Sequence, residues 1–290
     1  MSTGASPVQA VESGKSFSSW KAEMNTPTMI GIRPVAEDTT SLVSYFPIPF
    51  FGILPVNAFL IRAAEPVLVD TGLVVLRDSF MKHLRSIIDP GELRWIWLTH
   101  TDADHMGNLP PILDEAPRAR VITTYLGMGK MSLQQLPTDR VYLLNPGQSL
   151  DVGDRELLCL KLPSFDAPET TGLFDTSTRA LFSADCFGAL MKEPAEAAGD
   201  MASDDLQRGI ITWTTIDAPW LASADRNLWA RSLDRVRNLK PRHVLSGHLP
   251  PAEDLTDILL QHLDSAYDAS PFIGPDQKAL ENVMRVSGRG

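Results

Sequence analysis

Cysteine is scarce in this chain of 290 residues, where Cys159 and Cys186 are too few for a disulfide framework. No apolar run is long enough to cross a bilayer, and the N-terminus lacks the basic and apolar regions of a Sec signal. Positive charge is also scarce: the formal net charge is −10, and no basic stripe is present to neutralise phosphates. We therefore expect a globular, cytoplasmic protein that binds neither nucleic acid nor a membrane.

The chain divides into three parts by composition. Residues 1–27 are rich in Ser, Gly and Ala without sustained periodicity, and they are predicted to form a flexible N-terminal tail. Residues 28–270 carry the regular patterns, and 43% hydrophobic residues overall can supply a sizeable core. Residues 271–290 are predicted to be a C-terminal extension. The sequence thus indicates one domain with two flanking segments.

Strand and helix patterns alternate along that domain. Short apolar runs between Leu42 and Gly72 alternate with Pro and Gly, as in hairpin strands. Apolar residues have helical spacing over residues 73–88 and 222–239. Further strands are predicted at residues 120–125, 142–144, 157–162, 179–183 and 243–246. Strand runs followed by a helix occur twice, which favours an α/β fold, a four-layer αββα sandwich of two similar halves.

The most informative segment is LTHTDADHMG, residues 98–107. It places His100, Asp102, Asp104 and His105 within six positions, directly behind the apolar run WIWL that is predicted to be a buried strand. Four such groups in one small space would repel or stay unsatisfied unless a cation held them. The alternative is that the Asp and His residues only cap the next helix.

This segment resembles the H-x-H-x-D-H signature of the metallo-β-lactamase superfamily, with Asp102 in the second His place. That departure resembles the flavodiiron proteins and their oxygen-binding di-iron relatives, which carry a carboxylate there. Four further segments are similar in order and spacing, namely NAFLIRAAEPVLVDTG, IIDPGELRWIWLTH, LFSADCFGAL and LSGHLPP. Over residues 40 to 255, the resemblance implies the metallo-β-lactamase-like αββα sandwich.

The resemblance also implies a set of metal ligands. One metal takes His100, the carboxylate of Asp102, a further His and a bridging Asp; the other takes Asp104, His105, the bridging Asp and His248. Asp185 after the strand LFSA matches the bridge, although it could also only cap a turn. His248 has a solvent-facing loop His as its alternative, and His243 within the preceding strand is predicted to be a packed or outer residue.

The middle His of this set is missing. Its place, some nineteen residues before the bridging Asp, holds Asp166. Either Asp166 replaces the His as a ligand, which we favour, or the metal has only His100, Asp102 and the bridge. Asp166 would otherwise be a loop residue facing water, and a slip of one residue would place Phe165 there. The remaining His83 and His262 are expected at the surface of helices.

The donor types bear on which metal binds. Four carboxylates and three imidazoles favour iron or manganese over zinc, because oxygen donors suit harder cations. Four carboxylates also cancel the charge of two divalent ions, which weakens the Lewis acidity that a zinc hydrolase uses. Two ferric ions would retain positive charge. We expect two metal ions, iron first, with manganese or zinc as the alternatives.

Three functions follow from these expectations. The first is a di-iron protein that binds or reduces dioxygen or nitric oxide with electrons from a separate donor, because no phosphate loop for a flavin follows the last ligand. The second is a binuclear hydrolase of an ester, lactone, thioester or phosphoester, in which a metal-bridging hydroxide attacks and Asp104 takes the proton as the catalytic residue. The third is an oxygen sensor without enzymatic activity.

Contacts with substrate and partners are less determined. Residues 191–219 follow the bridging Asp and are predicted to be a lid or a dimer element. Trp213 and Trp220 either line a pocket or pack, and packing is the commoner use of such residues. Cys186 is expected to be a buried, unreactive thiol, since acidic neighbours raise the pKa of a thiol. The resemblance makes a homodimer plausible.

Overall fold

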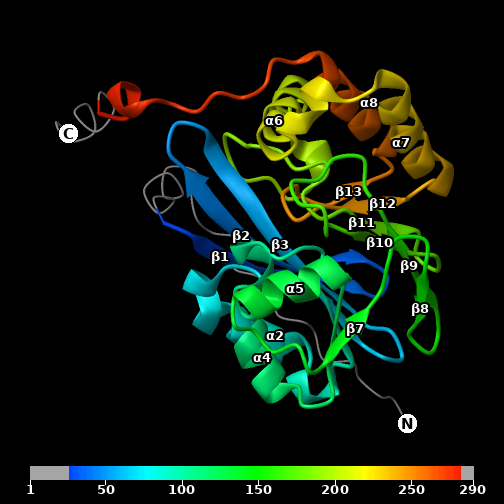
Figure 1. Cartoon of the computed structure of the whole chain (residues 1–290). Coiled ribbons are helices and arrows are strands. Elements are labelled where there is room, and N and C mark those ends of the chain that lie inside the picture. The colour runs from blue at the N-terminus through cyan, green and yellow to red at the C-terminus, as the bar shows by residue number, and fades with distance from the viewer. Residues whose placement is uncertain (1–25, 282–290) are drawn as a thin grey trace, which may run out of the picture.

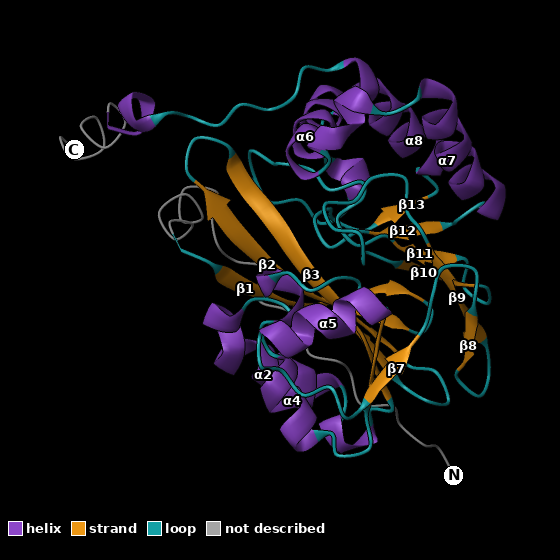
Figure 2. Cartoon of the chain, viewed as in Figure 1, coloured by secondary structure: helices purple, strands orange, loops and turns teal. Residues whose placement is uncertain are grey.

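The computed structural model describes residues 26–281, in which two β-sheets pack face to face with helices on both outer sides (Figure 1). One outer side carries α2 (Arg77–Ile87), α4 (Leu109–Glu115) and α5 (Tyr125–Leu133), and the other carries α6 (Ser203–Asp217), α7 (Arg226–Leu239) and α8 (Thr256–Ser265) (Figure 2). This order of layers confirms the predicted α/β, metallo-β-lactamase-like αββα sandwich. Nearly all of the predicted tail, residues 1–27, lies outside the described residues.

The first sheet has seven strands that follow one another in chain order. They are β1 (Thr28–Ala36), β2 (Thr39–Ile48), β3 (Gly52–Ile61), β4 (Val67–Val69), β5 (Trp95–Trp97), β6 (Arg120–Thr123) and β7 (Val141–Leu143). The pairs from β1 to β4 are antiparallel, and the pairs from β4 to β7 are parallel. The predicted hairpin region between Leu42 and Gly72 is therefore confirmed.

The second sheet has six strands in the order β13-β12-β11-β10-β9-β8. They are β8 (Ser149–Asp151), β9 (Glu156–Leu160), β10 (Gly172–Asp175), β11 (Ala180–Phe182), β12 (His243–Leu245) and β13 (Ala252–Glu253). Only β11 and β12 pair in parallel; the other neighbours are antiparallel.

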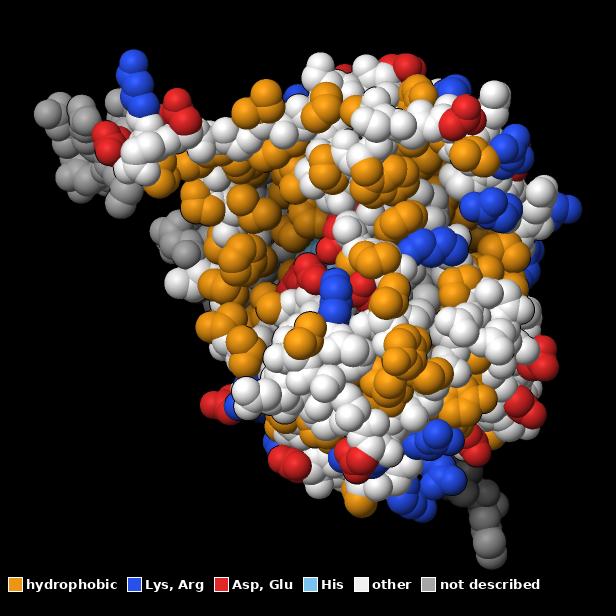
Figure 3. Space-filling model, in the orientation of Figure 1, with side chains coloured by type: hydrophobic (Ala, Val, Ile, Leu, Met, Phe, Trp, Pro, Cys, Tyr) orange, Lys and Arg blue, Asp and Glu red, His pale blue; other side chains and the backbone are white. Residues whose placement is uncertain are grey.

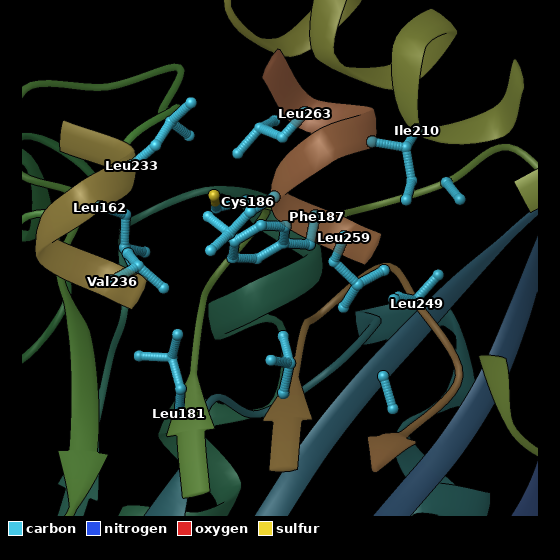
Figure 4. Close-up of a cluster of buried hydrophobic side chains, with 14 of the residues drawn as sticks. Leu162, Leu181, Cys186, Phe187, Ile210, Leu233, Val236, Leu249, Leu259 and Leu263 are labelled. Atoms are coloured by element: carbon cyan, nitrogen blue, oxygen red, sulfur yellow. The ribbon is translucent and has the colours of Figure 1, made fainter. Parts of the chain in front are cut away.

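Hydrophobic side chains fill all three spaces between the four layers. Strand β5 is buried on both faces: Ile96 packs toward the helices of its sheet, and Trp97 packs between the two sheets. This explains the unbroken apolar run in that strand. Figure 4 shows the cluster outside the second sheet, where Leu233 of α7 and Leu259 of α8 lie around Phe187. Hydrophobic packing on both faces of the sheets thereby fixes the positions of the strand ends and of the loops that follow them.

Two predicted elements end differently in the structure. The predicted strand at residues 120–125 stops at Thr123, because the Thr124 side chain accepts a hydrogen bond from the Gly127 N–H and so caps α5. The predicted helix at residues 222–239 is divided. A 3₁₀ turn ends at Ser223, and α7 begins at Arg226 after the cap Asp225.

Two further expectations concern the outer helices. The expectation that His262 lies at the surface is wrong: it is buried on α8, where the helix packs against α6 and α7. Residues 191–219, predicted to be a lid or dimer element, contain α6, which packs along α8. No helix among residues 26–281 is long and apolar enough to cross a membrane.

The parallel strands bring four chain segments to one place. The chain leaves β4 at Asp70, β5 at the segment 98–107, β11 at Asp185 and β12 at His248. The carboxyl ends of parallel strands lie at the same edge of a sheet, which is where open α/β sheets place their ligands. Polar groups from both sheets therefore meet between the two halves.

Candidate metal centre

The four residues predicted in the segment after β5 lie partly at the strand end and partly at a short helix. His100 leaves the strand end directly, while Asp104 and His105 lie on the short helix α3 (Ala103–Met106), with Asp102 as its preceding residue. His100 and His105 are fully buried, Asp104 has a side chain that is 28% exposed, and Asp102 is exposed. Asp102 makes no side-chain capping hydrogen bond to α3, so the alternative of a mere helix cap does not describe it.

Asp185 lies at the middle of three histidines. Its Oδ1 is 2.9 Å from His105 Nε2, 3.3 Å from His248 Nε2 and 3.7 Å from His100 Nε2. These rings come from both halves of the sandwich. The expected bridging residue is thus the one carboxylate that, in the described part of the chain, contacts all three imidazoles.

Asp104 joins two of these rings on the other side. Its Oδ2 lies 3.4 Å from His248 Nε2 and 3.6 Å from His105 Nε2. The ligand atoms of these three residues all lie within 4.8 Å of one another. This second group matches the three unshared ligands expected for one metal.

Asp166 lies with His100 and Asp102, again with ligand atoms within 4.8 Å of one another. The Thr170 hydroxyl donates to Asp166 Oδ1 at 3.3 Å. Although Asp166 is exposed, its carboxyl group borders the centre. Phe165 instead packs on Trp220, with ring centroids 4.9 Å apart, so the one-residue slip does not occur.

Outer hydrogen bonds fix the orientation of two rings. His105 Nδ1 lies 2.9 Å from Asp70 Oδ2, and His248 Nδ1 lies 2.7 Å from the carbonyl oxygen of Pro55. Neither a carboxylate nor a carbonyl can donate, so both Nδ1 atoms carry the proton. In the neutral ring each Nε2 then has its lone pair toward the centre, as metal-bound histidines require. Thr99 holds Asp70 in turn through its N–H and its hydroxyl.

The charges of the centre are strongly coupled. Burial opposes ionisation of Asp185, but the neighbouring His248 and His100 hold the pKa of Asp185 well below its usual range. Partial desolvation of the Asp102 carboxyl group raises its pKa; the neighbouring His100 opposes this effect, and Asp166 adds to it. The centre therefore requires positive charge close to Asp185, which either protonated rings or metal cations can supply.

The residues present fit a bound metal. His100 Nε2 and Asp185 Oδ1 are buried without a hydrogen-bond partner. Such orphaned polar atoms are rare in protein interiors and point to a ligand that satisfies them. The space-filling view shows acidic side chains gathered in a hollow between the two halves, with hydrophobic side chains around it (Figure 3). The hollow thus opens on the face that Figure 3 shows.

A family model described as "ODP family beta lactamase" matches residues 54–248, more than half of the chain. The chain belongs to this family. The protein named "Putative diflavin flavoprotein A 1" from Thermosynechococcus vestitus is 30% identical over 213 residues, which cover 72% of this chain and 34% of that protein. "Nitric oxide reductase" from Moorella thermoacetica is 28% identical over 133 residues, covering 46% and 33%. The ODP-family chain spans about a third of the length of these relatives.

Solved structures agree on the fold of this ODP-family protein. The rubredoxin oxygen:oxidoreductase from Desulfovibrio gigas superposes with a TM-score of 0.72 at 17% identity, covering 82% of this chain and 61% of that one. A variant of the flavo-di-iron protein from Thermotoga maritima gives a TM-score of 0.73 at 19% identity, covering 91% and 69%. The flavodiiron-like resemblance drawn from the metal motif is therefore confirmed for family and fold.

Two side chains of α6 reach the centre of this ODP-family protein: Trp213, which was expected to line a pocket or to pack, and Asp217, which was not predicted. Trp213 donates from its Nε1 to the Asp185 carbonyl at 3.1 Å, and its ring lies 4.8 Å from that of His248. Asp217 is buried, and one of its oxygens lies within 4.8 Å of oxygens of Asp166 and Asp185. Burial, reinforced by these two charges, raises the pKa of Asp217 to about 9. No local motif marks Asp217, because a helix distant in sequence brings it to the centre.

Four other residues from the sequence analysis lie near the centre or in the strands beside it. Asp70 lies in the segment NAFLIRAAEPVLVDTG, but its contact with His105 was not predicted. Trp220 is 36% exposed and packs on Phe165. Cys186 is buried, and burial raises its pKa to about 12, which confirms an unreactive thiol. His243 is buried in β12, as expected for a packed residue.

Proposed function

We propose that this protein is a di-iron protein that binds or reduces dioxygen or nitric oxide, with electrons from a separate donor. The observation that carries the proposal is the convergence of three imidazoles and four carboxylates around the orphaned Asp185 Oδ1. An oxygen-rich set of this kind suits iron or manganese better than zinc. The names of similar proteins, which include a nitric oxide reductase and an oxygen oxidoreductase, support the same chemistry.

The proposed ligand sets share one residue. One iron would be held by His100, Asp102, Asp166 and Asp185, and the other by Asp104, His105, His248 and Asp185. Bound iron would supply the redox-active centre at which the gas is held and reduced. Asp185 would neutralise both cations at once, which makes it the residue on which the pair depends.

The protein itself orients the ligand rings. Asp70 and the Pro55 carbonyl hold the His105 and His248 rings in the tautomer that leaves Nε2 available. Asp104 would bind iron as a carboxylate in this centre, and its catalytic role as the proton acceptor belongs to the hydrolase alternative; its partly exposed side chain lies beside these two rings.

The surroundings of this unit are also proposals. We propose residues 28–270 as the functional domain, residues 271–290 as an extension, and a homodimer as the assembly. Both cysteines are free and buried, which supports a reducing, cytoplasmic location. A small diatomic gas needs no large pocket, so we propose no binding site for a bulky substrate.

Gas consumption tests the proposal. Iron-loaded protein is reduced anaerobically by a small electron donor and then mixed with dioxygen or nitric oxide, with an electrode as the readout. We expect consumption by the wild-type protein and none by Asp185→Ala. A spectral change without turnover would indicate a sensor. Hydrolysis of esters, lactones, thioesters or phosphoesters by the zinc form, without gas consumption by the iron form, would indicate the hydrolase and contradict the proposal.

A further inference from the structure

Asp217 is the buried carboxylate that the metal motif does not contain. It is the last residue of α6, only 8% exposed, and its Oδ2 has no hydrogen-bond partner. An unsatisfied carboxylate oxygen inside a protein is unfavourable unless a cation or a donor meets it. Among the described residues Asp217 Oδ2 therefore has no partner, and a bound cation would both satisfy this oxygen and replace the proton that the raised pKa otherwise keeps on the carboxyl group.

The surroundings of Asp217 make this need stronger. Oxygens of Asp166, Asp185 and Asp217 lie within 4.8 Å of one another. Among residues 26–281 no Lys or Arg lies within 4.0 Å of their oxygens; Lys161 acts on Asp166 from farther away. The C-terminal end of a helix also carries partial negative charge, and the last turn of α6 has no basic residue. All of these fields favour a cation beside Asp217.

The position of α6 is fixed by close packing on the metal loops. Trp213, one turn before Asp217, donates to the Asp185 carbonyl. A Cβ at Gly188 would lie 2.5 Å from the Trp213 ring, and a Cβ at Gly209 would lie 2.6 Å from the Leu190 carbonyl oxygen. Both glycines thus permit a helix approach that any side chain would prevent. The close packing of α6 therefore fixes the position of Asp217 at the centre.

We propose that Asp217 is a further ligand of the metal held by His100, Asp102, Asp166 and Asp185. This inference rests on the proposed binuclear centre and adds to it. The chain has no histidine at the middle position of the family pattern, and the carboxylates of Asp166 and Asp217 would together supply the ligands that this histidine does not provide. A set with five carboxylates over the two metals selects hard cations more strongly than four.

The test uses metal content and affinity, independent of activity. Wild type, Asp217→Asn, the smaller Asp217→Ser and the control Asp204→Asn are purified with iron supplied, and iron per chain is measured before and during chelator titration. Asp204 is exposed on the same helix and distant from the centre along it. We expect two irons in wild type and control. Each Asp217 variant should keep one iron at wild-type affinity and bind the other at least about 10- to 100-fold more weakly.

Two irons at wild-type affinity in either folded Asp217 variant would overturn the inference while leaving the proposed function intact. Fewer than two irons in the wild-type protein would contradict the proposed function itself. A crystal of wild-type protein soaked in Mn²⁺ decides the matter without any variant. A metal within about 2.0–2.6 Å of an Asp217 oxygen supports the inference. Anomalous density at the centre without such a contact rejects it.

Discussion

At the scale of single residues, the importance of each aspartate for metal binding depends on how many of the other proposed ligands it contacts. Asp185 lies beside three imidazoles from both halves of the sandwich, whereas Asp166 lies at the edge, beside His100 and Asp102. A residue shared by two cations neutralises both, and a residue at one cation affects that one alone. The two aspartates should therefore differ in the number of metals that their loss removes.

Replacing Asp185 with Ala should remove both metals, and replacing Asp166 with Ala should weaken only one. The readout is metal per chain by elemental analysis after dialysis against a weak chelator, with Asp204→Asn as an exposed control. Retention of both metals at full affinity in Asp166→Ala would show that Asp166 is only a loop residue beside the centre.

Asp70 offers a test of the outer hydrogen bonds. Asp70→Asn keeps the shape of the side chain, but the amide lacks the charge that holds the His105 Nδ1 proton. We expect metal affinity to fall by about 10- to 100-fold, the range typical of such outer partners, with little change in fold. Unchanged affinity in a chelator competition would mean that His105 is oriented by packing alone.

Some residues of the centre could be found from the sequence more easily than others. His100, Asp102, Asp104 and His105 are close in sequence, so one strand end and one short helix carry them together. Asp166, Asp185 and His248 could be identified as candidate ligands only from their spacing in the family pattern. Asp217 has no such pattern, because its place at the centre is set by tertiary packing.

At the scale of elements, α6 shows why local patterns are insufficient. Its sequence SDDLQRGIITWTTID is rich in β-branched residues, which have low helix propensity. Packing along α8 and against the loop at Gly188 stabilises the helix despite that composition. In the same way, the two glycines of α5 obscured a helix that Thr124 caps. The buried strand β5 was predictable, because its apolar run reports its burial directly.

The approach of α6 can be tested at Gly188. A methyl group there would overlap the Trp213 ring, so Gly188→Ala should lower the free energy of unfolding by about 1–3 kcal/mol. The displaced indole should also change the tryptophan fluorescence. Gly129→Ala is the matched control: no atom lies within 4 Å of its Cβ position in α5, and the change should stabilise by about 0.5–1 kcal/mol. Equal effects of the two variants would contradict the packing account.

At the scale of the whole molecule, the buried guanidinium of Arg155 joins the two sheets. Arg155 lies between β8 and β9, and its guanidinium pairs with the adjacent Asp154, with Asp38 of the β1–β2 turn and with Asp175 at the end of β10. The Arg155 side chain is only 7% exposed, and Asp175 is fully buried. Both halves must stay in register for the four strand ends to meet, so this contact supports the centre indirectly.

Arg155→Met should lower the free energy of unfolding by about 3–5 kcal/mol, because it leaves the buried Asp175 without its cation. Arg237→Met, which removes an exposed ion pair with Asp234, is the control and should change stability by less than about 1 kcal/mol. Urea denaturation measures both. A small effect at Arg155 would show that the hydrophobic layer between the sheets suffices to hold the halves together.

The four-layer fold and most of the centre were predictable from the sequence, whereas the carboxylate contributed by α6 was not. The central claim is that the carboxylate-rich centre binds two iron ions, and the identity of the bound metal tests this claim most directly. Protein expressed without added metal is analysed for iron, manganese and zinc per chain. The account predicts about two irons per chain, lost together in Asp185→Ala. Two zincs per chain, or no bound metal, would contradict it.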